Sequence, residues 1–171
     1  MATSASLSIR LACAQDAPRL VEVEASAGAL FCTIPDLAWI ADEPLGSPEA
    51  FLPLIAAGTV WVAQDALGHV IGELRGEICG GDLHILELAV ALDFQQRGIG
   101  RRLIDAAKDL ARARGLKALT LTTFRHVAWN APFYARYGFL ELKGDARLAA
   151  IVQAEEARGL PNRCAMRMAL R

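Results

Sequence analysis

A glycine-bearing loop that follows one strand and opens one helix is the most informative stretch of the sequence. Residues 87–90 are Glu-Leu-Ala-Val, and residues 95–100 are Gln-Gln-Arg-Gly-Ile-Gly. Two glycines let the main chain approach a ligand closely, and the first free N–H groups of a helix attract an anion. Arg97, Arg101 and Arg102 add positive charge near this turn, and a guanidinium fork fits phosphate better than an ammonium group does. This stretch therefore predicts a phosphate-binding loop.

Two other glycine-loop motifs do not fit these residues. A P-loop requires the pattern G-x-x-x-x-G-K-[ST], which the sequence does not contain here. A dinucleotide-binding fingerprint requires a third small residue where Leu103 stands. The strands before the loop also have the pattern of hairpins rather than of the crossovers in a doubly wound sheet. The remaining alternative is a glycine-lined turn without a ligand.

The loop resembles the acetyl-CoA motif of the GNAT superfamily of N-acetyltransferases. Gln95, Gly98 and Gly100 match its pattern Q/R-x-x-G-x-G/A. The resemblance covers residues 85–139, because NAPFYARYGF at residues 130–139 is similar to the family's downstream asparagine and its Y-x-x-x-G-F segment. The rest of the chain agrees with the family in the order of its elements only.

This resemblance implies an α+β fold in which a single acetyltransferase domain spans residues 1–171. The implied sheet is mixed, mostly antiparallel, seven-stranded and flanked by helices. It is splayed between its fourth and fifth strands, which here are residues 83–90 and 117–123, and the acetyl-CoA arm fills the opening.

The resemblance also implies which residues bind acetyl-CoA, with no metal. In the family, main-chain groups at the end of the fourth strand pair with the pantetheine arm, and the loop that follows holds the pyrophosphate. Carried over to this sequence, the cofactor-binding residues are Leu88, Ala89, Val90, Gln95, Gln96, Arg97, Gly98, Ile99, Gly100, Arg101, Asn130 and Phe133.

Acyl transfer from a thioester to an amine needs a neutral nucleophile, a polarised carbonyl and a proton for the departing thiolate. Tyr134 resembles the family's general acid, and its phenol can protonate the thiolate if the two are closely positioned. The alternative is that Tyr134 packs on the sheet or orients the sulfur. Tyr137 is the local competitor, but it immediately precedes Gly138 and so misses the family position.

Glu87 is the candidate base, since it lies on the strand beside the expected thioester. Its side chain alternates away from Leu86 and Leu88, and an ordered water can relay the proton. A carboxylate there would also attract a cationic amine, so the role of substrate anchor stays open, as does that of a solvated glutamate. His84, on the opposite face, is a weaker candidate base.

The elements that must position these residues follow from hydrophobic periodicity and turn residues. Residues 59–90 predict an antiparallel meander, and a right-handed crossover through the next helix places strands 83–90 and 117–123 side by side or nearly so. Residues 28–46 predict irregular or short helical structure that could line a pocket. Strands are expected over residues 9–13, 59–64, 70–78, 83–90, 117–123, 139–142 and 164–170, and helices over residues 16–27, 47–57, 99–114, 130–137 and 147–158.

Composition excludes several classes of protein. With 171 residues, 18 basic and 19 acidic side chains and a net charge of -1, the chain predicts one compact domain and no nucleic-acid partner. No apolar run approaches the ~18 residues that span a bilayer. Residues 1–10 lack the pattern of a signal peptide, so we expect a cytoplasmic protein. Four scattered cysteines indicate reduced, mostly buried thiols, and none has a histidine assigned to it that would indicate a nucleophile.

The predicted function is acetyl transfer from acetyl-CoA to a primary amine, by direct transfer in a ternary complex. The acceptor is expected to be a small molecule, with protein N-termini or lysines as an alternative and a longer acyl-CoA as a variant of the donor. A non-catalytic CoA-binding regulatory module is the second class. A homodimer through strand 164–170 is a possibility that the sequence leaves open.

Overall fold

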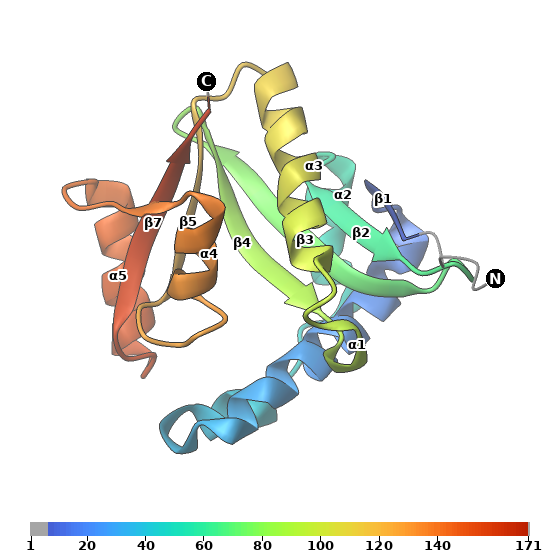
Figure 1. Cartoon of the computed structure of the whole chain (residues 1–171), viewed down its shortest axis with the longest axis horizontal. Coiled ribbons are helices and arrows are strands. Elements are labelled where there is room, and N and C mark those ends of the chain that lie inside the picture. The colour runs from blue at the N-terminus through green and yellow to red at the C-terminus, as the bar shows by residue number, and fades with distance from the viewer. Residues whose placement is uncertain (1–6, 171) are drawn as a thin grey trace. The chain divides into compact units, whose positions relative to one another are not determined.

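The computed structural model describes residues 7–170, whose strands form one seven-stranded sheet (Figure 1). The strands are β1 Ser8–Leu11, β2 Val60–Gln64, β3 Val70–Cys79, β4 Asp82–Val90, β5 Ala118–Phe124, β6 Leu140–Glu141 and β7 Arg163–Ala169. Their order in the sheet is β1-β2-β3-β4-β5-β7-β6. The sequence of residues 1–10 predicted that no signal peptide is present. Most of these residues lie outside the described part of the chain.

The helices match the predicted ones to within a few residues. The α-helices are α1 Ala17–Gly28, α2 Leu52–Ala56, α3 Ile99–Ala113, α4 Ala131–Tyr137 and α5 Ala146–Ala157. Shorter 3-10 helices cover Ala14–Asp16, Ala29–Thr33, Pro35–Asp42, Pro48–Phe51 and Leu92–Phe94. Residues 28–46 thus form short helical turns, as predicted. The helix expected over residues 47–57 is divided into a 3-10 turn and α2, because Pro53 lacks an N–H donor inside it.

The sheet is mixed, which confirms the predicted fold class. The pairs β1–β2, β2–β3, β5–β7 and β6–β7 are antiparallel, whereas β4 and β5 are parallel. The parallel pairing joins residues 83–85 to residues 119–121, near the amino ends of both strands. This confirms that the strands on either side of α3 are neighbours. The predicted opening of the sheet beyond this pairing stays a prediction.

The chain divides into two compact units, and the first contains residues 7–76 and 87–107. Its core lies between α1 and one face of β2, β3 and β4. Leu20 and Val23 of α1 pack with Val60 and Val62 of β2 and with Ala89 of β4. The hydrophobic face of α1 therefore packs against this side of the sheet and is buried there.

On the other face of the same strands, the start of α3 packs against a glycine of β3, Gly72. A Cβ atom at Gly72 of β3 would lie 3.2 Å from Ile99 Cγ2 and 3.3 Å from the carbonyl oxygen of Ala89. Both contacts are tighter than ordinary van der Waals contact. A glycine is needed here because α3 lies so close to the strand.

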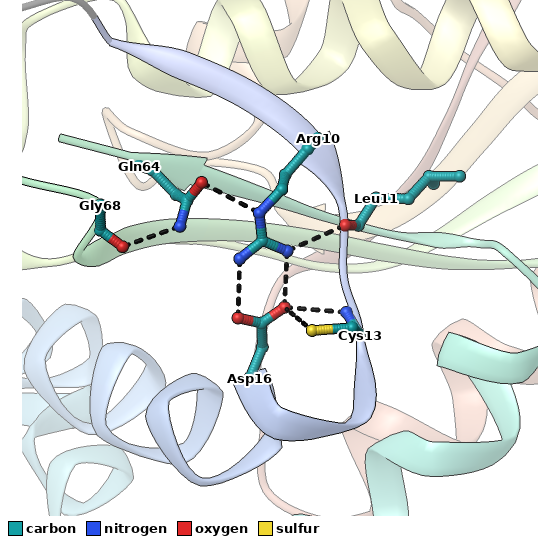
Figure 2. A network of polar contacts seen from close by, with 6 residues as sticks. All are labelled: Arg10, Leu11, Cys13, Asp16, Gln64 and Gly68. Atoms are coloured by element: carbon teal, nitrogen blue, oxygen red, sulfur yellow. Dashed lines mark hydrogen bonds and ion pairs between the residues drawn. The ribbon is translucent and has the colours of Figure 1, made fainter. Parts of the chain in front are cut away.

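A polar network ties β1 to the turn before α1 (Figure 2). The Arg10 guanidinium donates to both carboxylate oxygens of Asp16, at 2.7 and 2.8 Å, and the Cys13 N–H donates to Asp16 Oδ2 at 2.8 Å. Gln64 of β2 accepts a further bond from Arg10 at 2.9 Å. The hydrogen bonds from Arg10 hold the pKa of Asp16 at about 2, below the ordinary 3.8, despite its burial.

The second unit contains residues 77–86 and 108–170. In it, β5 pairs along its whole length with β7, and α5 packs on both strands. Thr122 of β5 donates to Glu155 of α5 at 2.8 Å, and Arg163 of β7 donates to the same carboxylate at 2.8 and 3.0 Å. The last helix is therefore attached to the sheet by polar as well as apolar contacts.

The expectation about the thiols was only partly right. All four cysteines are free, but only Cys164 is buried, whereas Cys13 and Cys32 are exposed. The prediction of mostly buried thiols was wrong because Cys13 lies between β1 and the next 3-10 turn and Cys32 lies in the short 3-10 helix Ala29–Thr33, where burial depends on contacts that spacing does not show. Among residues 7–170, no helix has both the length and the apolar character needed to cross a bilayer.

Candidate active site

The last residues of β4 lie in the first unit and lead into the predicted phosphate loop. Glu87 is half-buried, and its Oε1 accepts a hydrogen bond of 3.1 Å from the Leu88 N–H. Ala89 is buried, and the Val90 carbonyl accepts a bond of 3.0 Å from Gln95 Nε2. Two main-chain groups that the resemblance implies for the cofactor arm, at Leu88 and Val90, are thus engaged by side chains of the chain itself.

The loop turns through backbone conformations that suit glycine. Gln96 has a φ of 60° and Gly98 a φ of 77°, and α3 begins at the next residue, Ile99. A Cβ atom at Gly98 would meet no heavy atom within 4 Å. Arg102 N donates to the Gly98 carbonyl at 3.2 Å, so this bond belongs to the first turn of the helix, where main-chain N–H groups generally lack intrahelical acceptors.

These features fit an anionic ligand such as the pyrophosphate of acetyl-CoA. The open space beside Gly98 allows a phosphate group to reach the main chain, and α3, with 15 residues, is long enough to present a helix N-terminus. A side chain at Gly98 would enter this open space.

The three arginines near the loop differ in how they are held. Arg97 is exposed and donates from Nη2 to the Asp93 carbonyl at 2.9 Å. Arg102 donates from Nη2 to the Leu7 carbonyl at 2.8 Å. Arg101 is exposed on the first turn of α3. Arg97 and Arg102 therefore place positive charge near the turn from positions that the main chain fixes.

In the second unit, Asn130 stands at the start of α4. Its backbone has φ −110° and ψ −114°, and its carbonyl accepts the Tyr134 N–H at 3.1 Å. The side-chain Oδ1 is buried and has no hydrogen-bond partner among the described residues. A buried acceptor without a partner in the chain is what a ligand donor can satisfy. The role of Asn130 in binding the cofactor stays a prediction.

Tyr134 lies on α4 with its ring packed between two others. It is buried, and the rings of Phe133 and Phe139 meet it edge-on with centroid distances of 5.1 and 5.5 Å. Tyr137, the competing tyrosine, has its hydroxyl 3.3 Å from Lys108 Nζ. Tyr137 also lies beside Phe139, with ring centroids 6.3 Å apart, so both tyrosines of α4 contact this ring.

Two weaker candidates are bonded within the second unit. His84 is buried with Nδ1 3.0 Å from Thr120 Oγ1, and burial lowers its pKa, which favours a neutral imidazole. Arg125, the residue that follows β5, donates to Glu141 at 2.9 Å. That pairing raises the pKa of Arg125 and lowers the pKa of Glu141. The carboxylate that Arg125 binds is therefore one of the chain's own.

The sequence predictions missed a buried acid in the first unit. Glu73 of β3 is fully buried, and its charge interacts with those of Arg75 on the same strand, Glu24 of α1 and Glu87 of β4. A signal was available, because an acid interrupts an otherwise apolar stretch of strand there. Alternation could not show which face of the sheet it occupies or what covers that face.

Comparison with known proteins adds a family and a fold. Residues 56–141, just over half of the chain, match the family model described as "Acetyltransferase (GNAT) domain". Similar solved structures include the PaiA N-acetyltransferase of Thermoplasma acidophilum in complex with coenzyme A, with a TM-score of 0.71 and 19% identity over 96% of this chain and 99% of that one.

Two other solved structures have the same fold. One is the ribosomal-protein-S18-alanine N-acetyltransferase of Escherichia coli, with a TM-score of 0.71 and 17% identity over 96% of this chain and 94% of that one. The other is the N-acetylglutamate synthase of Neisseria gonorrhoeae, complexed with coenzyme A and N-acetyl-glutamate, with a TM-score of 0.72 and 21% identity over 99% of this chain but 36% of that one. At these identities the likeness concerns the fold alone.

Proposed function

Because the chain belongs to the GNAT acetyltransferase family, and is therefore an acyltransferase that uses acetyl-CoA, we propose that its acceptor is the primary amine of a small molecule. We propose further that the acetyl group moves directly to the amine in a ternary complex. The observation that carries the donor side is the open, positive-φ glycine at the start of α3. The near-neutral charge of the chain supports a small acceptor, since it does not indicate a highly basic target.

The residues proposed to hold acetyl-CoA come from β4, the loop, α3 and α4. They are Leu88, Ala89, Val90, Gln95, Gln96, Arg97, Gly98, Ile99, Gly100, Arg101, Asn130 and Phe133. When bound, acetyl-CoA supplies an acetyl group activated as a thioester. The Leu88 N–H donates to Glu87 Oε1 in this structure, so a ligand acceptor that took this N–H would release that carboxylate oxygen.

Glu87 is proposed as the base. An amine that arrives as an ammonium ion must lose a proton before it can attack, and the Glu87 carboxylate accepts that proton directly or through a water. Its negative charge also attracts the ammonium form. The half-buried position supports both roles, because the carboxylate is partly shielded from solvent yet accessible.

Tyr134 is proposed as the acid. Its hydroxyl donates a proton to the leaving sulfur, so that a thiol rather than a thiolate departs. The two flanking aromatic rings support this role, because they fix the orientation of the Tyr134 ring.

The experiment that tests the function measures acetyl-CoA-dependent thiol release against a panel of acceptors. The panel holds small mono- and polyamines, amino acids, amino sugars, and peptides with a free N-terminus or a lysine. Turnover confined to the small amines supports the proposal, and turnover of the peptides alone overturns it. Acetyl-CoA binding without turnover of any acceptor would favour the regulatory module.

A matched pair of glycine variants tests the donor site. Gly98→Val puts a side chain into the open space beside the loop, and we expect it to abolish acetyl-CoA binding in calorimetry. Gly68→Val is the control, since Gly68 also has a positive φ, of 83°, and open space around it, but lies between β2 and β3. Both variants bear similar backbone strain. Equal acetyl-CoA affinity in the two would contradict the assignment of the loop.

A further inference from the structure

Glu73 is a carboxyl group buried without a hydrogen-bond partner. Its side chain is fully buried, and neither carboxyl oxygen has a partner within residues 7–170. In the register of β2 and β3 it lies opposite Val62, on the face that packs against α1. An ionised carboxylate in such a place would lose its hydration and gain no hydrogen bond in return. The site therefore favours the protonated acid.

The charged groups around Glu73 come from three elements. Arg75, two residues further along β3, forms an ion pair with Glu24 of α1, and its guanidinium lies 4.5 Å from the centre of the Phe51 ring. The neighbouring strand contributes Glu87. The cluster thus has three carboxyl groups and one guanidinium, and the guanidinium is already engaged by Glu24.

Taken together, these surroundings raise the proton affinity of Glu73. Burial is the largest effect and raises the pKa of Glu73, and the charges of Glu24 and Glu87 raise it further. The charge of Arg75 opposes them without reversing the result. Glu73 is therefore a buried carboxyl group whose proton affinity depends on the charges of Glu24 and Glu87.

We propose that Glu73 keeps its proton at neutral pH and so leaves Glu87 as the ionised member of a carboxyl pair. Two carboxylates in one poorly hydrated site tend to share a proton, and the fully buried member is the one that retains it. Glu73 then acts as a positioning residue, because it influences the amine only through Glu87. This inference rests on the proposed function in taking Glu87 as the base.

The first test measures stability against pH, without any substrate. Between the ordinary pKa of 4.5 and the raised one, the folded protein binds one proton more than the unfolded chain, so stability falls as the pH rises. The unfolding equilibrium constant of the wild type, divided by that of Glu73→Gln, is expected to rise about tenfold per pH unit in this range. Parallel curves for the two proteins would overturn the proposal.

The second test measures the coupling to Glu87. In Glu87→Gln the neighbouring negative charge is gone, so the pH-dependent loss of stability that Glu73 causes should end at a lower pH than in the wild type. Glu77→Gln, an exposed acid on the same strand, is the control and should leave that end point where it is. An end point that Glu87→Gln does not move overturns the pair.

Activity supplies a readout that a structural role would not change. The kcat/KM of the wild type, divided by that of Glu73→Gln, should stay constant from acidic to neutral pH. It should change only above the pH at which the difference in stability between the two proteins stops growing. A ratio that is independent of pH throughout overturns the positioning role. If Glu87→Gln retains full acetyl transfer, the proposed base is wrong, whereas the protonated state of Glu73 still depends on the unfolding data alone.

A second measurement covers the case in which Glu73→Gln does not fold. In wild-type protein labelled with carbon-13 at the glutamate carboxyl carbons, one signal should remain in the protonated position at pH 7. That signal should shift in Glu87→Gln and not in Glu77→Gln. Its absence from the wild-type spectrum overturns the proposal.

Discussion

The ring of Tyr134 makes the contacts that hold this residue in place, whereas its hydroxyl is the group proposed to act as the acid. Tyr134→Phe removes only the hydroxyl and keeps the edge-on contacts with Phe133 and Phe139. We therefore expect the packing of the ring to be kept and kcat to fall about 100-fold or more, the usual contribution of a positioned acid. Steady-state thiol release at saturating acetyl-CoA measures the change.

Tyr137→Phe is the matched control for this variant. It removes a hydroxyl from the same helix, but one that lies 3.3 Å from Lys108 Nζ. Its kcat should stay close to that of the wild type. If both variants lose activity equally, the acid has not been identified.

Asp16 gives a pH-dependent prediction for stability. Its folded pKa of about 2 lies below the ordinary 3.8, so its contribution is complete above about pH 4 and is lost as the pH falls towards 2. Asp16→Asn should therefore cost about 2 kcal/mol of unfolding free energy at pH 7, and progressively less below pH 4. Urea unfolding from pH 7 to pH 3 measures this difference.

Asp109→Asn is the comparison, because Asp109 is exposed and lies 3.8 Å from Arg112 on the surface of α3. Exposed pairs of this kind contribute little. A penalty for Asp16→Asn that does not change with pH would show that the Arg10 pair is not its source.

The structural features of some residues could be predicted from the sequence, whereas those of others could not. Gly98 could be predicted, because a ligand loop that opens a helix needs a backbone conformation that only a few residue types allow. The burial of Glu73 could not, because it depends on α1 covering this face of β3. The orphaned oxygen of Asn130 was also beyond prediction, since spacing does not show which side-chain atoms are left without a partner.

At the scale of elements, the approach of α3 to β3 makes Gly72 a sensitive position. A methyl group there would press on Ile99 and on the rigid carbonyl of Ala89, at 3.2 and 3.3 Å. Gly72→Ala should cost about 1–3 kcal/mol of unfolding free energy, as overpacking usually does. It should also weaken acetyl-CoA binding, because α3 carries the loop glycines at its start. Denaturant unfolding and calorimetric titration measure the two effects.

Gly28→Ala provides the control, since a Cβ atom at that position in α1 meets nothing within 4 Å. It should be neutral or slightly stabilising. Similar losses in both variants would mean that the penalty comes from the backbone and not from the contact with α3.

The local elements were largely predictable, and the exceptions have physical causes. Each amphipathic helix and hairpin encodes its own periodicity and turn residues, so bounds shifted by only a few residues. The helix over residues 47–57 was interrupted because Pro53 removes a donor inside it. The exposure of Cys13 depended on neighbouring elements, which periodicity does not describe.

At the scale of the whole molecule, the strand order could not be derived from local patterns. The final strand, β7, inserts between β5 and β6, so β6 pairs with a strand that follows it by more than twenty residues. In this position β7 pairs antiparallel with β5 on one side and with β6 on the other. The overall sheet could be predicted only through the family resemblance.

The prediction that residues 1–171 act as a single domain can be tested by unfolding. The elements β3, β4 and α3 each run through both compact units, so loss of either unit would leave strands with unpaired main-chain groups. We therefore expect one cooperative transition. In Trp129→Phe the remaining tryptophans, Trp39 and Trp61, report on the first unit, while thiol labelling of buried Cys164 reports on the second. The two urea midpoints should coincide, and separated midpoints would show that the units fold as independent domains.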